Sequence, residues 1–139
     1  MRNKKIVLIG FLFIIIFGFL NSGCDNENNG SENNNSDEYY VKYEVNSSTK
    51  HQGFKLDVTI TNESSQNMNI FINPSAPWET IIGPVKKGFN AKLKVACNNT
   101  LALYTQISVS KNGSPFALKK IDGSDTSRNS VQIDYTIDY

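Results

Sequence analysis

The stretch FNAKLKVAC, residues 89–97, decides the fold class, because apolar side chains at its odd positions alternate with Asn90, Lys92, Lys94 and the small Ala96. Such period-two alternation is typical of a β-strand with one face on an apolar core and the other in water. The same pattern predicts further strands over 41–45, 54–60, 68–72, 101–109 and 131–137, with weaker candidates at 78–82 and 116–121. No segment beyond the N-terminal stretch has the apolar spacing of a helix, so we expect an all-β domain.

Turn-forming residues separate these predicted strands. Asn112-Gly113 follows one strand directly, and an Asn-Gly pair supplies the positive φ angles of a tight hairpin. Similar turn residues lie at 62–65, 73–75, 87–88 and 122–125. Seven to eight short strands within residues 39–139 predict an immunoglobulin-like antiparallel β-sandwich, and a small barrel is the alternative.

The first 23 residues have the order of a secretory signal peptide. Arg2, Lys4 and Lys5 precede an apolar run over 6–20, and small residues follow it. The run is shorter than the roughly 20 residues that a transmembrane helix needs. We therefore expect a signal peptide over 1–23 that is removed, and a permanent helical anchor is the alternative.

The segment Leu20-Asn21-Ser22-Gly23-Cys24 resembles the lipobox of bacterial lipoproteins. This resemblance implies that Cys24 becomes the first mature residue and carries acyl chains that bind the membrane. An unmodified thiol is the alternative. Residues 24–38 carry five acids, no base and no apolar side chain apart from Cys24, which predicts a disordered tether. Acids soon after Cys24 also resemble the surface-export signal of Bacteroidetes lipoproteins.

Three short motifs of the β domain resemble the MmpS family: 41–45 (VKYEV), 56–62 (LDVTITN) and 76–80 (APWET). A fourth segment, 106–113, matches a short strand and turn glycine of that family, so the likeness extends over about 40–138. The resemblance implies an extracytoplasmic β-sandwich that assists an RND-type lipid transporter. Members of that family keep a transmembrane helix where this chain has a lipobox-like segment.

The composition gives little support for catalysis, metal binding or nucleic-acid binding. The net charge is +1, with 14 Lys and Arg against 13 Asp and Glu, whereas nucleic-acid binding favours a strongly basic domain. His51, the one histidine, lies in a polar loop, and a general-base role there has no partner in sequence. Cys97 has the inward register, so we expect a buried thiol rather than a nucleophile. We predict no catalytic residue, no cofactor and no metal site, and interpret 122–125 as a turn rather than a calcium loop.

Binding features are the remaining candidates. Lys92 and Lys94 occupy the outward register of one strand, and Lys86 and Lys87 precede it. They form either a basic contact surface for an anionic glycan, a lipid headgroup or an acidic partner, or an ordinary soluble strand face. Trp78 either anchors a ligand or packs against the core.

The sequence therefore predicts a bacterial cell-envelope protein that is lipid-anchored at Cys24, in the outer membrane and exposed at the cell surface. We expect a non-enzymatic binding or accessory module whose partner is the membrane and an envelope protein, glycan or lipid. The alternatives are an accessory subunit of an RND-type transporter, by likeness to MmpS, and an envelope enzyme. Fold analogy alone does not decide among them.

Overall fold

The computed structural model describes residues 36–48, 54–73 and 75–139. The predicted signal peptide, Cys24, residues 24–35 of the predicted tether and His51 lie outside this range. Within the described residues, no helix is long and apolar enough to cross a membrane.

The described residues form eight β-strands, and each falls on a segment that the sequence predicts. Their bounds are β1 Tyr39–Ser47, β2 Leu56–Thr61, β3 Asn67–Ile72, β4 Trp78–Val85, β5 Asn90–Leu101, β6 Leu103–Lys111, β7 Ala117–Gly123 and β8 Arg128–Thr136. Alternation of apolar and polar side chains found six of these strands clearly, whereas β4 and β7 were the weaker candidates, and β7 (ALKKIDG) has no buried alternate face.

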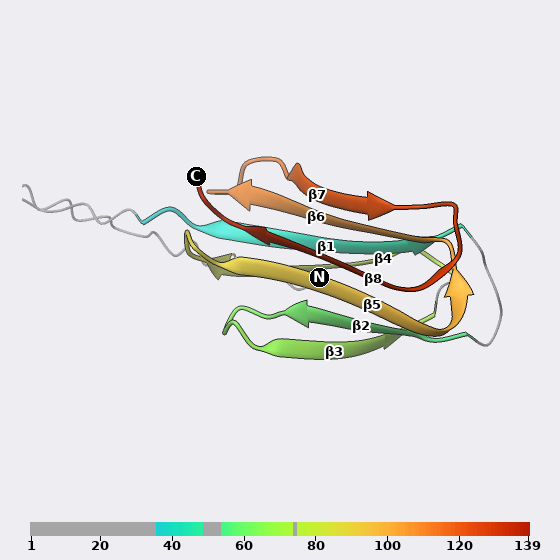
Figure 1. Ribbon diagram of the computed structural model, residues 1–139. Coiled ribbons are helices and arrows are strands. Elements are labelled where there is room, and N and C mark those ends of the chain that lie inside the picture. The colour runs from blue at the N-terminus through green and yellow to red at the C-terminus, as the bar shows by residue number, and fades with distance from the viewer. Residues whose placement is uncertain (1–35, 49–53, 74) are drawn as a thin grey trace, which may run out of the picture. The chain divides into compact units, whose positions relative to one another are not determined.

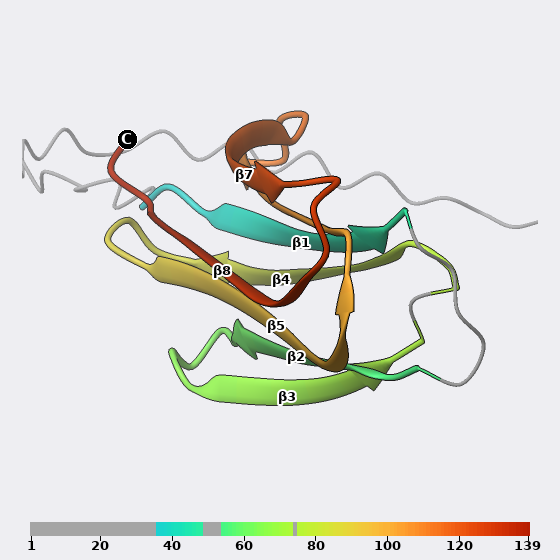
Figure 2. The same ribbon diagram turned by 45° about the vertical axis from the view of Figure 1, so that its right-hand side comes forward.

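The strands form two antiparallel four-stranded sheets that face each other as a sandwich (Figures 1 and 2). Sheet A has the order β4-β1-β6-β7, and sheet B has the order β3-β2-β5-β8. The predicted all-β sandwich and its number of strands are thus confirmed. The order differs from that of constant-type immunoglobulin domains, in which the first two strands are neighbours in one sheet. Here β1 and β2 belong to different sheets.

The core lies between the sheets and is built from their inward-facing side chains. Its largest fully buried members come from both sheets and from the residue after β8; they are Tyr39, Tyr43, Leu56, Ile60, Leu93, Leu101, Leu103, Ile107 and Ile137. Tyr43 of sheet A donates a hydrogen bond of 2.9 Å from its hydroxyl to the carbonyl of Thr61 in sheet B. The Thr61 hydroxyl oxygen in turn accepts a 3.2 Å bond from the backbone N–H of Lys92. This polar chain joins β1 of one sheet to β2 and β5 of the other.

The last three residues of the predicted tether are held on the domain. The Asp37 carboxylate lies 2.6 Å from Lys111 Nζ and accepts a 2.8 Å bond from the Asn112 side chain. The Glu38 N–H donates to Asn112 Oδ1 at 2.9 Å, and the Asn112 N–H donates to the Glu38 carbonyl at 2.8 Å. The hydrogen bond from Lys111 lowers the pKa of Asp37. We call Asp37, Glu38, Lys111 and Asn112 the β1 clasp; through it, residues just before β1 contact the domain.

The turn that carries Asn112 has the predicted conformation. Asn112 has a φ of 50° and Gly113 a φ of 75°, as a tight Asn-Gly hairpin requires. This geometry aims the Asn112 backbone and side chain at Glu38, so the turn between β6 and β7 also positions the start of β1.

The outer faces of the two sheets differ. On sheet A, Ile81 at one margin and Leu118 and Ile121 at the other are each about half exposed. Polar side chains cover most of sheet B, and Thr59 donates a 2.8 Å hydrogen bond to Asn69 across the β2–β3 pair. Sheet A thus exposes apolar side chains at both margins, and sheet B exposes Phe71 on its edge strand β3.

Candidate functional site

The register of sheet A brings two carboxylates together. In the antiparallel pair of β1 and β4, Glu44 lies directly opposite Glu79. On the other side of β1, Glu44 lies opposite Gln106 of β6. Directly opposed side chains have Cβ atoms about 4.5–5.5 Å apart and point to the same face. The three side chains thus form one row across three strands on the outer face of sheet A.

Lys42 partly neutralises this row. Its Nζ lies 3.1 Å from Glu44 Oε1 and 4.0 Å from Glu79 Oε2, so one ammonium group serves two carboxylates. The same Nζ lies 5.7 Å from the centre of the Phe116 ring. Glu44, Glu79 and Lys42 together therefore carry a formal net charge of about −1.

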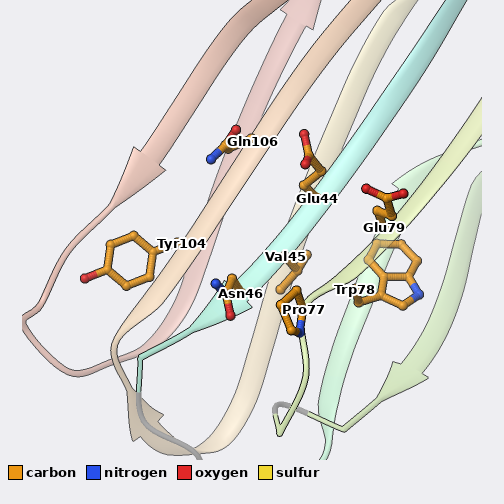
Figure 3. Close-up of a pocket in the computed structure, with 8 residues that line it drawn as sticks. All are labelled: Glu44, Val45, Asn46, Pro77, Trp78, Glu79, Tyr104 and Gln106. Carbon is orange, nitrogen blue, oxygen red and sulfur yellow. The ribbon is translucent and has the colours of Figure 1, made fainter. Parts of the chain in front are cut away.

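A hollow of about 340 Å³ opens beside this row. In Figure 3, Trp78 and Pro77 lie on one side of it and Tyr104 on the other, with Asn46 between them. We call it the acidic hollow. It is lined by Glu44, Val45, Asn46, Pro77, Trp78, Glu79, Tyr104 and Gln106.

Two polar contacts fix the Tyr104 side of the acidic hollow. The Tyr104 hydroxyl donates a short hydrogen bond to Asp125 in the loop after β7, and this bond raises the pKa of the hydroxyl. Behind that loop, Arg128 binds both carboxylate oxygens of Asp122 at 3.0 and 3.2 Å and donates to the Leu103 carbonyl at 3.1 Å. Bidentate guanidinium–carboxylate pairs hold their geometry well. The predicted turn at 122–125 is correct only for Ser124 and Asp125, since Asp122 and Gly123 are the last residues of β7.

The acidic hollow is rich in hydrogen-bond acceptors. Glu44 and Glu79 offer carboxylate oxygens, and Asn46 and Gln106 each offer an amide oxygen together with two donors. Trp78 and Pro77 add apolar surface. In the described part of the chain, no group of three or more His, Cys, Asp or Glu is placed to hold a metal ion. The arrangement suits a ligand with several hydroxyl groups and an apolar face.

The predicted basic surface divides into two parts. Lys92 and Lys94 are exposed on the outer face of sheet B, where Lys92 lies opposite Asp134 and Lys94 lies opposite Gln132. Asp134 offsets the positive charge of this strand face, an acid that proximity in sequence did not reveal. Lys86 and Lys87 lie instead in the turn between β4 and β5.

That turn borders a second hollow of about 540 Å³, which is next to the β1 clasp. Its lining residues are Ser36, Asp37, Tyr39, Lys86, Lys87, Lys111 and Tyr139. Two of the three lysines are already engaged, since Lys86 donates to Ser36 at 2.7 Å and Lys111 pairs with Asp37. Lys86 and Lys111 therefore contact the residues just before β1.

The two remaining candidates fall near their predicted places. Trp78 is half-buried, lies opposite Val45 and packs against the core, while part of it lines the acidic hollow. Cys97 is free and half-buried rather than buried as predicted. It lies opposite Leu56, the first residue of β2, and packs partly against the core.

Reasoning from the sequence missed Glu44, Glu79 and Gln106. All three occupy outward positions of predicted strands, which marks them as surface side chains. The sequence carries no signal that β1 is the strand between β4 and β6, and only that order places the three in one row.

The chain was also compared with known proteins. No family model and no curated protein matches the chain. The likeness to the MmpS family therefore rests on the short sequence motifs alone.

Proposed function

We propose that this protein is a lipid-anchored, non-enzymatic binding module of the bacterial cell envelope, with the acidic hollow as its contact site. The observation that carries the proposal is the combination in one concave site of two opposed carboxylates, two amides and the surfaces of Trp78 and Pro77. Ligand sites typically join apolar walls with a few convergent polar groups in this way.

The chemistry of the hollow favours a polyhydroxylated ligand such as a neutral or amino sugar. Sugar hydroxyls donate to carboxylate and amide oxygens, and hydrogen bonds to charged acceptors are the stronger ones. An anionic glycan or a lipid phosphate would meet Glu44 and Glu79 with only Lys42 to offset them. The ligand proposed for this face is therefore uncharged or positively charged.

Anchoring at Cys24 would place the domain at a bounded distance from the membrane. The lipobox-like segment and the apolar run before it support this part of the proposal. Several acyl chains give firm attachment, at about 0.8 kcal/mol for each buried CH₂ group. The twelve residue steps from Cys24 to Ser36 span at most roughly 43 Å, since an extended chain covers about 3.3–3.6 Å per residue. We place the anchor in the outer membrane, with the domain at the cell surface.

A binding experiment with two matched charge variants tests the site. The chain without residues 1–23, carrying Cys24→Ser to prevent acylation, is applied to immobilised neutral, amino and anionic saccharides. We expect the pair Glu44→Gln and Glu79→Gln to weaken binding at least about tenfold, because hydrogen bonds to charged groups contribute about 1.5–3 kcal/mol. The control pair, Lys92→Gln and Lys94→Gln, should bind like the parent. The opposite ranking would assign binding to the basic strand face of sheet B.

The anchor is tested separately in the full chain. Mass spectrometry of the membrane fraction should show a mature protein that begins at Cys24 and carries added acyl mass. The Cys24→Ala variant should leave that fraction or accumulate as an unprocessed precursor. A mature protein that retains residues 1–23 would contradict the lipid anchor and would leave the binding site untouched.

A further inference from the structure

The four edge strands of the described sandwich differ in how well they are protected. An exposed edge offers unpaired backbone groups to other chains, and natural proteins block it with Pro, charged side chains or bulges. Three edges here carry such features: Pro84 in β4, Lys119 and Lys120 in β7, and Arg128 and Asp134 in β8. The ladder beside each of these three strands also has a register shift.

The fourth edge, β3, has none of these features. Its sequence, NMNIFI, contains no charged residue and no proline. It pairs with β2 through six consecutive residues without a register shift. Phe71 is 71% exposed on this strand, the highest exposure among the large apolar side chains of the described residues. β3 is thus a regular, uncharged and partly apolar edge.

The backbone of β3 offers three donors and three acceptors at the open side. The Asn62 N–H donates to the Gln66 carbonyl at 2.8 Å, which makes this the hydrogen-bonded pair that closes the β2–β3 hairpin. Bonded and non-bonded pairs alternate along an antiparallel ladder. The N–H and C=O groups of Asn67, Asn69 and Phe71 therefore point away from β2 and toward the open edge.

The core is also incompletely covered at this edge. Met68 lies opposite Ile60 and Ile70 lies opposite Val58, so both have the inward register. Met68 nevertheless remains 37% exposed, and Ile70 is only partly buried. A strand added beside β3 would cover both side chains.

We propose that a second copy of this chain adds its own β3 to this edge, in antiparallel orientation about a two-fold axis through Asn69. Asn69 then lies opposite Asn69 of the partner subunit, and Asn67 opposite Phe71 of the partner subunit. All three open N–H and C=O groups of each β3 find partners in this register. Met68 meets Ile70 of the partner subunit on the inner face, which covers the exposed part of the core.

Self-pairing suits this strand because β3 carries no charge, so two copies bring no like charges into opposition. The other three edges are blocked, so pairing stops at a closed dimer with one continuous eight-stranded sheet. The acidic hollow lies on the other sheet, and the dimer does not depend on its ligand.

Crosslinking in membranes from cells that express the full chain tests the axis. Asn69→Cys places a thiol on each side of the axis, and a short bis-maleimide reagent should join two copies. The matched control is Gln132→Cys on β8, an exposed position at the opposite edge of the same sheet. A crosslinked dimer from Asn69→Cys, with none from Gln132→Cys or from the parent with Cys97, is expected. Equal yields from the two variants, or no dimer from Asn69→Cys, would overturn the proposal.

Charge substitution gives a second, independent arm. Asn69→Lys places two lysines at directly opposed positions, whose Cα atoms lie about 5.5 Å apart, and should weaken dimerisation about tenfold through repulsion of like charges at a solvated surface. Co-expression of differently tagged Asn69→Lys and Asn69→Glu chains should restore co-purification to the parental level or above. If both charged variants associate as well as the parent in detergent, the pairing edge lies elsewhere and the proposal is wrong.

Discussion

Removing one hydroxyl group, with Tyr43→Phe, should weaken the contact between the two sheets and change how the protein responds to alkaline pH. The Tyr43 side chain is fully buried, and its hydroxyl donates to the Thr61 carbonyl at 2.9 Å. Phenylalanine fills nearly the same volume, so the change removes a hydrogen bond without opening a large cavity.

The expected loss of stability at neutral pH follows from the Thr61 carbonyl, which Tyr43→Phe leaves without a hydrogen-bond donor. A typical intramolecular hydrogen bond contributes about 0.5–1.5 kcal/mol net, and a buried acceptor without a partner costs about 1–3 kcal/mol. The Thr61 carbonyl is buried between the sheets, so we expect the upper range, about 1–3 kcal/mol in the free energy of unfolding.

At alkaline pH the parent should lose more stability than Tyr43→Phe, which is opposite to the difference at neutral pH. Burial raises the pKa of Tyr43 well above its usual value, so the folded state holds the phenol proton more tightly than the unfolded state. The stability from this proton is complete below about pH 10 and is lost as the pH rises further, by up to about 1.4 kcal/mol per unit. The parent should therefore lose about 2 kcal/mol more than Tyr43→Phe between pH 9.5 and 11.5. Burial also raises the pKa of Tyr135, to about 12, so some alkaline loss remains in both proteins.

Denaturant unfolding at pH 7, 9.5, 10.5 and 11.5 measures this difference. Tyr40→Phe is the matched control, since Tyr40 lies on the outward face of the same strand. The gap between the parent and Tyr43→Phe should narrow above pH 10, while the gap for Tyr40→Phe stays constant. A Tyr43→Phe gap that is independent of pH would refute the assignment of a buried, proton-holding phenol.

Three further predictions concern the hollow, the core and the start of the domain. Gly123→Ala should weaken saccharide binding and also lower the free energy of unfolding by about 1–3 kcal/mol, because an added Cβ would overlap the ring of Tyr104 and displace it from its bond to Asp125; unchanged affinity and unfolding would contradict the place of this ring. Leu93→Ala should lower the free energy of unfolding by about 2–5 kcal/mol, since this side chain is fully buried, and a value under 1 kcal/mol in denaturant titration would contradict its place in the core. The lowered pKa of Asp37 means that its pairing with Lys111 stabilises the fold above the ordinary carboxyl pKa and is lost as the pH falls. The protection factors of the amides at the start of β1, which correct for the slower intrinsic exchange in acid, should therefore fall more between pH 6 and pH 3 in the parent than in Asp37→Asn.

Most of the strands were predictable because they show local alternation of side chains, as in 89–97, whereas β7 (ALKKIDG) lacks it and was only a weaker candidate. Their order was not, because pairing joins segments far apart in sequence. Lys92 and Asp134 lie opposite each other although 42 positions separate them, and no local pattern reports that contact. The basic strand face of Lys92 and Lys94 was predicted from their proximity in sequence, whereas Asp134, which offsets its charge, lies on another strand.

The acidic hollow escaped prediction for the same reason. Glu44 and Glu79 each have the appearance of an ordinary surface carboxylate, and only the register of β1 on β4 makes them a pair. Cys97 shows a different limit. It packs only partly against the core, at the last pair of the β2–β5 ladder, and period-two patterns carry no information on how far packing against the facing sheet extends.

The β1 clasp has a practical consequence for anyone who prepares the domain by itself. A fragment cut at Tyr39, where the composition changes, would discard Asp37 and Glu38 and leave Lys111 and Asn112 without their partners. β1 lies in the middle of sheet A, between β4 and β6, so a frayed start would disturb two ladders at once. Recombinant fragments, affinity tags and fluorescent fusions should therefore join the chain before Ser36, which makes the useful cloning boundary three residues earlier than the composition of the sequence suggests.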